Sequence, residues 1–195
     1  AKSSGAFVLY TSNAGVTGAS GYLNFRSGTT SSGSSGSIKV KTGSATNGKG
    51  GNVKVSVGSG NTLGGGDITI TAGEVTAATT VGGAVKVTGG TGSSSTAGQG
   101  GHLVYEGGSG AGGTGGSISL ATGAGTSTSS GSIVVRTADS GSAGTSGKLH
   151  ISTGSSLDGS SGAIKVLTGT AATGRGGKVI IDVGSSNENV GNDIR

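Results

Sequence analysis

The residues that could do chemistry in this sequence are few and stand apart from one another. Residues 43–49, Gly-Ser-Ala-Thr-Asn-Gly-Lys, have the spacing of a phosphate-binding loop, but Gly50 stands where that motif needs a Ser or Thr hydroxyl. The two histidines, His102 and His150, lie far apart in the sequence, and neither has a cysteine or histidine nearby to complete a metal site. We therefore expect no metal, no cofactor and no phosphate site.

The acidic and basic residues suggest no catalytic group either. The eight acidic residues, Asp67, Asp139 and Asp182 among them, do not recur in register, as a calcium-binding repeat would require. No carboxylate pair or Ser/His/Asp set has a convincing context, and the chain contains no cysteine nucleophile. One Arg-Gly-Gly at Arg175 is too sparse for an RNA-binding segment. The sequence predicts that the protein is not an enzyme, has no catalytic residues and binds no nucleic acid.

The composition limits the class of protein. The 195 residues include 47 Gly, no Pro and five aromatic residues, and only 11% are charged. Collagen is excluded because there is no Gly-X-Y period and no proline. Disorder driven by charge is not expected, and no apolar run is long enough to span a membrane. The net charge of +5 comes from single, scattered Lys and Arg residues. They indicate a solvated surface or, alternatively, contact with an anionic polysaccharide or mineral.

A tandem repeat organises the whole chain. Twelve units open with Gly-x-apolar-x-apolar, mostly 15 residues apart, and close in a polar loop rich in Gly, Ser and Thr. The units start at residues 5, 21, 36, 51, 66, 83, 101, 116, 131, 147, 162 and 177. We expect a single repeat domain over 1–195, with glycines where the chain turns with positive φ or where two backbones come close together.

Two apolar positions are filled in every unit. The pairs are Phe7/Leu9, Leu23/Phe25, Ile38/Val40, Val53/Val55, Ile68/Ile70, Val85/Val87, Leu103/Tyr105, Ile118/Leu120, Ile133/Val135, Leu149/Ile151, Ile164/Val166 and Val179/Ile181. Alternation with period two in aliphatic residues is typical of half-buried strands. Since one unit cannot bury its pair alone, we predict an all-β fold, a parallel β-solenoid in which all 24 side chains are buried.

Two coil geometries satisfy this pattern. One unit could close a whole coil, or two units could form a coil with their apolar faces packed together. We favour two units per coil, because the loops contain few apolar residues to oppose Ile and Val. Outward Thr-x-Thr occurs only once, at Thr69 and Thr71, which argues against ice binding.

The aromatic residues are concentrated near the N-terminus. Phe7, Tyr10, Tyr22 and Phe25 lie in the first two units, whereas residues 185–195 are polar. The cluster could cap the core, or it could form an axial interface, since aromatic residues are favoured at the centre of contacts. Open strand edges at both ends of a solenoid favour the interface. We therefore predict head-to-tail association, which generates a filament, with lateral contact as a second mode.

The Gly-Ser-Ile-x-Val-x-Thr-Gly openings and Gly-x-Gly-Gly closings resemble the Gly/Ser/Thr-rich tandem-repeat proteins of diatoms and related stramenopile algae. The resemblance covers nearly the whole chain and is one of repeat style. It implies an extracellular or cell-surface protein that forms a fibre, filament or surface coat. The alternative is an adhesive module that recognises polysaccharide, mineral or a cell surface.

Overall fold

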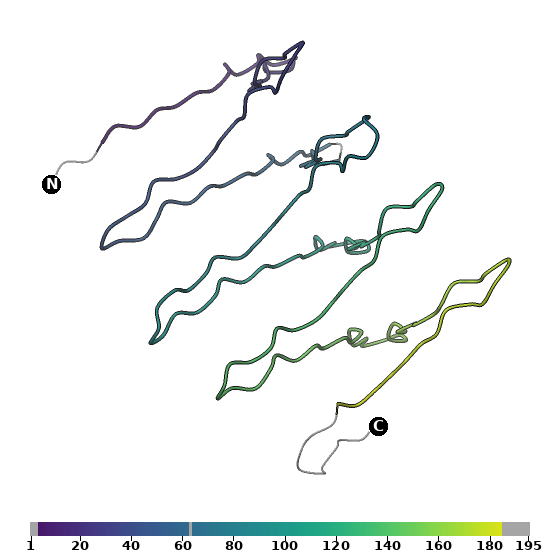
Figure 1. Cartoon of the computed structure of the whole chain (residues 1–195). Coiled ribbons are helices and arrows are strands. Elements are labelled where there is room, and N and C mark those ends of the chain that lie inside the picture. The colour runs from purple at the N-terminus through teal and green to yellow at the C-terminus, as the bar shows by residue number, and fades with distance from the viewer. Residues whose placement is uncertain (1–3, 63, 185–195) are drawn as a thin grey trace. The chain divides into compact units, whose positions relative to one another are not determined.

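The chain alternates between drawn-out segments and tight turns (Figure 1). The computed structural model describes residues 4–62 and 64–184, and it contains neither a helix nor a β-strand in these residues. The chain divides into two units, Ala1–Leu103 and Val104–Arg195, which are built in the same way. The turns of the first unit lie at 16–18, 31–33, 46–48, 61–62, 77–79 and 95–97, and those of the second at 111–113, 126–128, 142–144, 157–159 and 172–174.

Each turn falls between one apolar pair and the next. These stretches are rich in Gly, Ser, Thr and Asn, which favour turns because they tolerate unusual backbone angles or bond to their own backbone. The backbone is left-handed at Gly33 (φ 99°), Gly174 (φ 116°) and Asn47 (φ 58°). Thr79 also has a positive φ of 64°. This conformation is rare for a β-branched residue.

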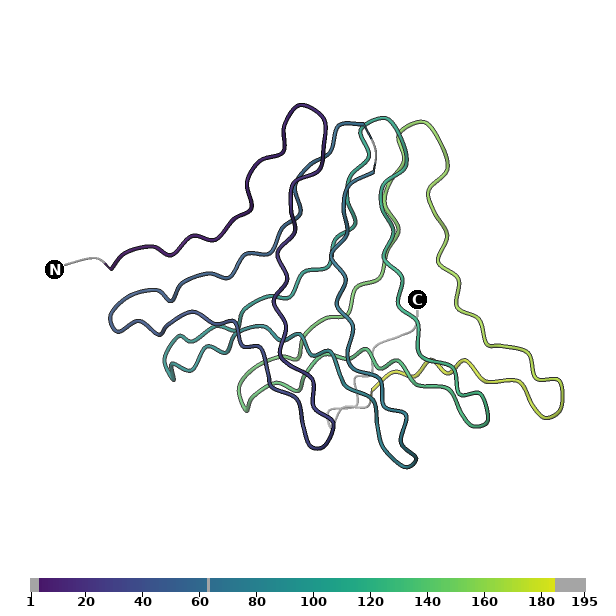
Figure 2. The same ribbon diagram turned by 90° about the horizontal axis from the view of Figure 1, so that it is seen from above.

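The backbone doubles back at the turns (Figure 2). At the base of each turn, the glycine that opens the next unit lies close to the preceding arm of the turn. In the turn at 46–48, a Cβ added to Gly51 would lie 3.3 Å from the Thr42 side chain. In the turn at 111–113, a Cβ on Gly107 would collide with the carbonyl oxygen of Gly116. The two arms of these turns therefore approach closely, at the opening glycine Gly51 in one turn and at Gly107, on the arm opposite the opening glycine, in the other. A side chain at either glycine would push the arms apart.

The predicted all-β solenoid, whether with one or two units per coil, is wrong for the described part of the chain. The drawn-out segments have no backbone hydrogen bonds to one another. Six backbone hydrogen bonds are present among residues 4–62 and 64–184, and all lie within turns or close their bases. A folded domain forms about one hydrogen bond per residue. The period-two pattern gives drawn-out segments, but these segments do not pair.

The prediction that all 24 apolar side chains are buried is also wrong. Ile38, Val40, Ile118 and Ile133 are 57%, 78%, 56% and 57% exposed. No hydrophobic side chain of the described residues is buried. The accessible surface of the chain is 19546 Å², whereas a compact protein of 17.9 kDa exposes about 8000 Å² and the same chain unfolded about 26000 Å². Residues 4–62 and 64–184 on their own therefore form no hydrophobic core.

The remaining predictions about the fold concern the ends and the membrane. The polar segment at 185–195, predicted to meet a neighbour's aromatic end, lies outside the described residues. No helix in the part of the chain that the structure describes has the length and apolar character needed to cross a membrane. The single repeat domain over 1–195 stays a prediction.

Candidate functional site

The drawn-out segments place charged and apolar side chains at alternating positions. Counting the opening glycine of a unit as position 1, we call positions 3, 5 and 7 the apolar series and positions 2, 4 and 6 the polar series. In the segment 131–137 the apolar series is Ile133, Val135 and Thr137, and the polar series is Ser132, Val134 and Arg136. Successive side chains of an extended backbone point to opposite sides, so each series shares one side of its segment.

The apolar series is exposed to a similar degree along the described chain. From Leu23 onward, the position 3 side chains are 49–58% exposed and the position 5 side chains 55–78% exposed. An Ile, Leu or Val that keeps half or more of its surface in water gains only part of its burial free energy, which is about 1.5–3 kcal/mol when complete. A similar, partly exposed apolar surface therefore recurs in each unit.

Position 7 is where each segment meets the base of the following turn. Five described residues are only partly exposed, and all five occupy this position: Thr11, Ser27, Ala72, Gly89 and Gly107. The Thr11 hydroxyl donates a hydrogen bond of 3.1 Å to the carbonyl oxygen of Gly21, the opening glycine of the next unit. Position 7 is thus the least exposed position in these five units, although other residues at this position, such as Val57 and Val183, are 48% and 46% exposed.

The polar series carries every charge found at positions 1–7 of the units. Its basic residues are Arg26, Lys39, Lys41, Lys54, Lys86, Arg136, Lys148, Lys165 and Lys178, and its acidic residues are Asp67, Glu106 and Asp182. All twelve side chains are exposed. The apolar series holds no charged residue in any unit. The even positions of these residues within the repeat, opposite the apolar pairs, can be read directly from the sequence.

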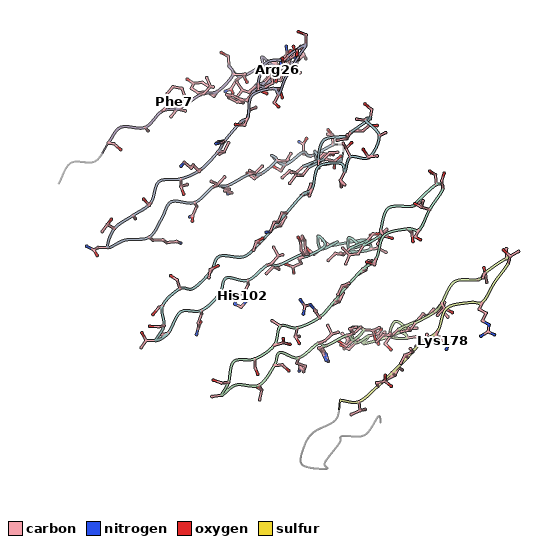
Figure 3. All side chains as sticks on the ribbon, in the orientation of Figure 1. Phe7, Arg26, His102 and Lys178 are labelled. Atoms are coloured by element: carbon pink, nitrogen blue, oxygen red, sulfur yellow. The ribbon has the colours of Figure 1, made fainter. Side chains whose placement is uncertain are left out.

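The residues first considered for chemistry lie apart. His102 is at position 2 of one segment and His150 at position 4 of another, and Lys49 lies at the exposed base of the turn 46–48. Figure 3 shows His102 and Lys178 projecting from the ribbon of their segments. Across residues 4–62 and 64–184 no cavity is found, and no group of His and acidic side chains could hold a metal ion.

The four aromatic residues of the first two units are largely exposed. Phe7, Tyr10, Tyr22 and Phe25 keep between 68% and 89% of their surface in water. Phe7 and Phe25 belong to the apolar series, whereas Tyr10 and Tyr22 belong to the polar series of their segments. The aromatic side chains therefore do not cap a core by packing into it. Their role as an axial interface stays a prediction.

The comparisons with known proteins add no family. No protein-family model, no curated protein and no solved structure matches the chain. The resemblance to algal Gly/Ser/Thr-rich repeat proteins therefore stays a prediction that rests on the repeat itself.

Proposed function

We propose that this protein is a structural, extracellular or cell-surface repeat protein whose copies associate into a fibre, filament or surface coat. One observation carries the proposal: the apolar pair of each unit is left exposed in the same register, from Phe7/Leu9 to Val179/Ile181. Exposed apolar surface of this extent marks interaction sites in soluble proteins. The extracellular location rests on the resemblance of the repeats alone.

A second copy of the chain is the partner that fits this surface best. Its apolar pairs recur with the same spacing, so two copies can match pair with pair along many units. The contribution of one pair is small, but contacts that form together along one chain add to each other. The drawn-out segments also leave most of their backbone N–H and C=O groups unpaired, and such groups are available to another chain.

The alternative function is an adhesive module that binds polysaccharide, mineral or a cell surface. The surplus of basic residues in the polar series favours it. The two functions use opposite sides of the same segments. Association of copies needs the apolar series, whereas adhesion to an anionic surface needs the polar series.

A pair of triple variants tests the proposed function. The first is Ile70→Asp, Ile118→Asp and Ile133→Asp, all in the apolar series, and the second is Thr69→Asp, Ser119→Asp and Val134→Asp, in the polar series of the same segments. Both change the net charge by the same amount. We expect the first to raise the concentration at which assemblies appear by at least ~100-fold, since each lost Ile contact costs about 1.5–3 kcal/mol and 1.4 kcal/mol is a factor of ten.

The readout is the pelletable fraction after ultracentrifugation, with electron microscopy of the pellet. The polar-series variant should assemble at or below the concentration that the unchanged chain requires. Equal inhibition by the two variants, or no assembly of the unchanged chain at any concentration and salt, would contradict the proposal.

A further inference from the structure

We propose that the polar series binds a linear polyanion that carries carboxylate or sulfate groups, and that this binding removes the charge repulsion that opposes side-by-side association of copies. The inference rests on the proposed function, because it assumes that the apolar series of one copy lies against another copy. It assigns a second binding surface to the same segments.

The polar series is mainly basic, and its charges lie on the side of each segment opposite the apolar series. The polar series holds nine basic and three acidic residues, all exposed. The seven-residue segment 36–42 carries Lys39 and Lys41 on one side, with Ile38 and Val40 on the other. A segment of this kind presents a cationic edge and an apolar edge at the same time.

Basic side chains within one segment are spaced closely enough to act together. Side chains two residues apart on an extended backbone lie about 7 Å apart, and the Debye length is about 10 Å at 0.1 M salt. Lys39 and Lys41 therefore act together on an anion. Lys49 and Arg175 instead lie at the bases of two separate turns, with glycine on both sides of each.

Copies of the chain cannot neutralise one another's charge. The described residues contain eleven Lys and Arg against six Asp and Glu. Identical segments packed side by side bring a lysine close to its counterpart, and like charges that face each other oppose the contact. A polyanion lying along the polar series supplies the missing negative charge without covering the apolar series.

The distribution of the charges indicates the kind of anion. The basic residues of the polar series are spread over eight of the twelve units, and the described residues form no cavity that would hold a small anion. Single weak contacts yield useful affinity when one polymer makes many of them. A single-stranded nucleic acid would need aromatic residues for base stacking, and the polar series has only Tyr10 and Tyr22. A polysaccharide with carboxylate or sulfate groups is the better match.

The binding experiment uses the full chain at a concentration below assembly. Polygalacturonate and dextran sulfate supply carboxylate and sulfate groups, dextran is the neutral control, and poly(dT) represents nucleic acid. We expect both polyanions to bind at 0.02 M salt, with an affinity that falls steeply as salt rises, and dextran not to bind. Absence of binding, binding of dextran, or clearly tighter binding of poly(dT) than of both polysaccharides would overturn the proposal.

Two matched double variants locate the surface. Lys39→Gln with Lys41→Gln should weaken polyanion binding about five- to tenfold, the effect expected when two contacts to a polyanion are lost. Lys49→Gln with Arg175→Gln removes the same charge from turn bases and should weaken it less than about twofold. Equal losses in the two variants would show that only net charge matters, and the assignment to the polar series would be wrong.

The assembly experiment separates this inference from the proposed function. At 0.02 M salt, polygalacturonate in equal charge ratio should lower the concentration at which assemblies pellet, and at 0.5 M salt it should have no effect. If the chain assembles alone at 0.5 M salt but polyanion never promotes assembly at low salt, this inference is wrong and the proposed function stands. If polyanion binds but no assembly forms under any condition, the proposed function is wrong. The proposed promotion of assembly by the polyanion is then wrong as well.

Discussion

Neighbouring glycines in this chain have different roles, and Gly107 and Gly108 show the contrast. A Cβ on Gly107 would collide with the backbone of Gly116, whereas a Cβ on Gly108 would meet no atom within 4 Å. The Gly116 N–H donates a hydrogen bond of 2.8 Å to the carbonyl oxygen of Gly108. This bond closes the turn at 111–113, so only the first of the two glycines is required for closure.

We predict that Gly107→Ala opens this turn and that Gly108→Ala leaves it closed. Loss of one backbone hydrogen bond costs about 1 kcal/mol, so the solvent-exchange rate of the Gly116 amide, measured by NMR, should rise about fivefold in Gly107→Ala. Gly108→Ala is the matched control and should change it less than twofold. Equal exchange rates in the two variants would mean that the close approach at Gly107 does not exist in solution.

At the scale of elements, the turns are the ordered parts and the segments between them are open. The turn at 126–128 is closed by a hydrogen bond of 3.1 Å from the Gly131 N–H to the Gly123 carbonyl oxygen. Ile133 follows directly in the next segment and is 57% exposed. The turn therefore does not depend on the apolar side chain beside it.

For this reason we predict that Ile133→Asp has little effect on the dilute, unassociated chain. Because the introduced carboxylate stays hydrated, it loses no solvation free energy, and the exchange rate of the Gly131 amide should change less than twofold. Ser127→Asp, within the turn, should have a similarly small effect. Exchange at Gly131 that is tenfold faster in Ile133→Asp than in Ser127→Asp would instead reveal a buried core around Ile133.

The repeat predicts where the chain is drawn out but not what covers its apolar residues. Alternation such as Ile133, Val135 and Thr137 against Ser132, Val134 and Arg136 indicates an extended backbone with one apolar side. The same alternation is satisfied whether that side packs against the chain itself or against another molecule. The expected solenoid assumed the first case and was wrong, since Ile133 and its equivalents stay exposed.

The residues of the candidate site were also predictable only in part. The apolar pairs follow from their period alone, and the charges of the polar series could have been found by counting positions from each opening glycine. The close approach between Gly51 and the Thr42 side chain could not have been found in this way. It depends on how sharply the chain turns at 46–48, and neither composition nor spacing determines that.

At the scale of the whole molecule, charge and apolar surface act against each other. The net charge of +5 opposes contact between copies, whereas the proposed association would bury the exposed apolar series. We predict that raising the salt concentration from 0.02 to 0.5 M lowers the concentration at which the chain assembles, because the Debye length shrinks from roughly 20 Å to less than 5 Å. Light scattering over a concentration series measures this threshold. Assemblies that dissolve as salt rises would show that ion pairs, and not apolar contacts, hold the copies together.

The central claim is that this chain buries its apolar series only in association with other copies. Differential scanning calorimetry tests it most directly, on a dilute fraction that light scattering shows to be monomeric and on assembled material. A compact domain of 195 residues would absorb about 140 kcal/mol on unfolding near 60 °C, at ~0.7 kcal/mol per residue. We predict no cooperative transition in the monomer and a clear one in the assembly. A monomer that unfolds cooperatively with an enthalpy of that size would contradict the account, because such a chain would possess a core of its own.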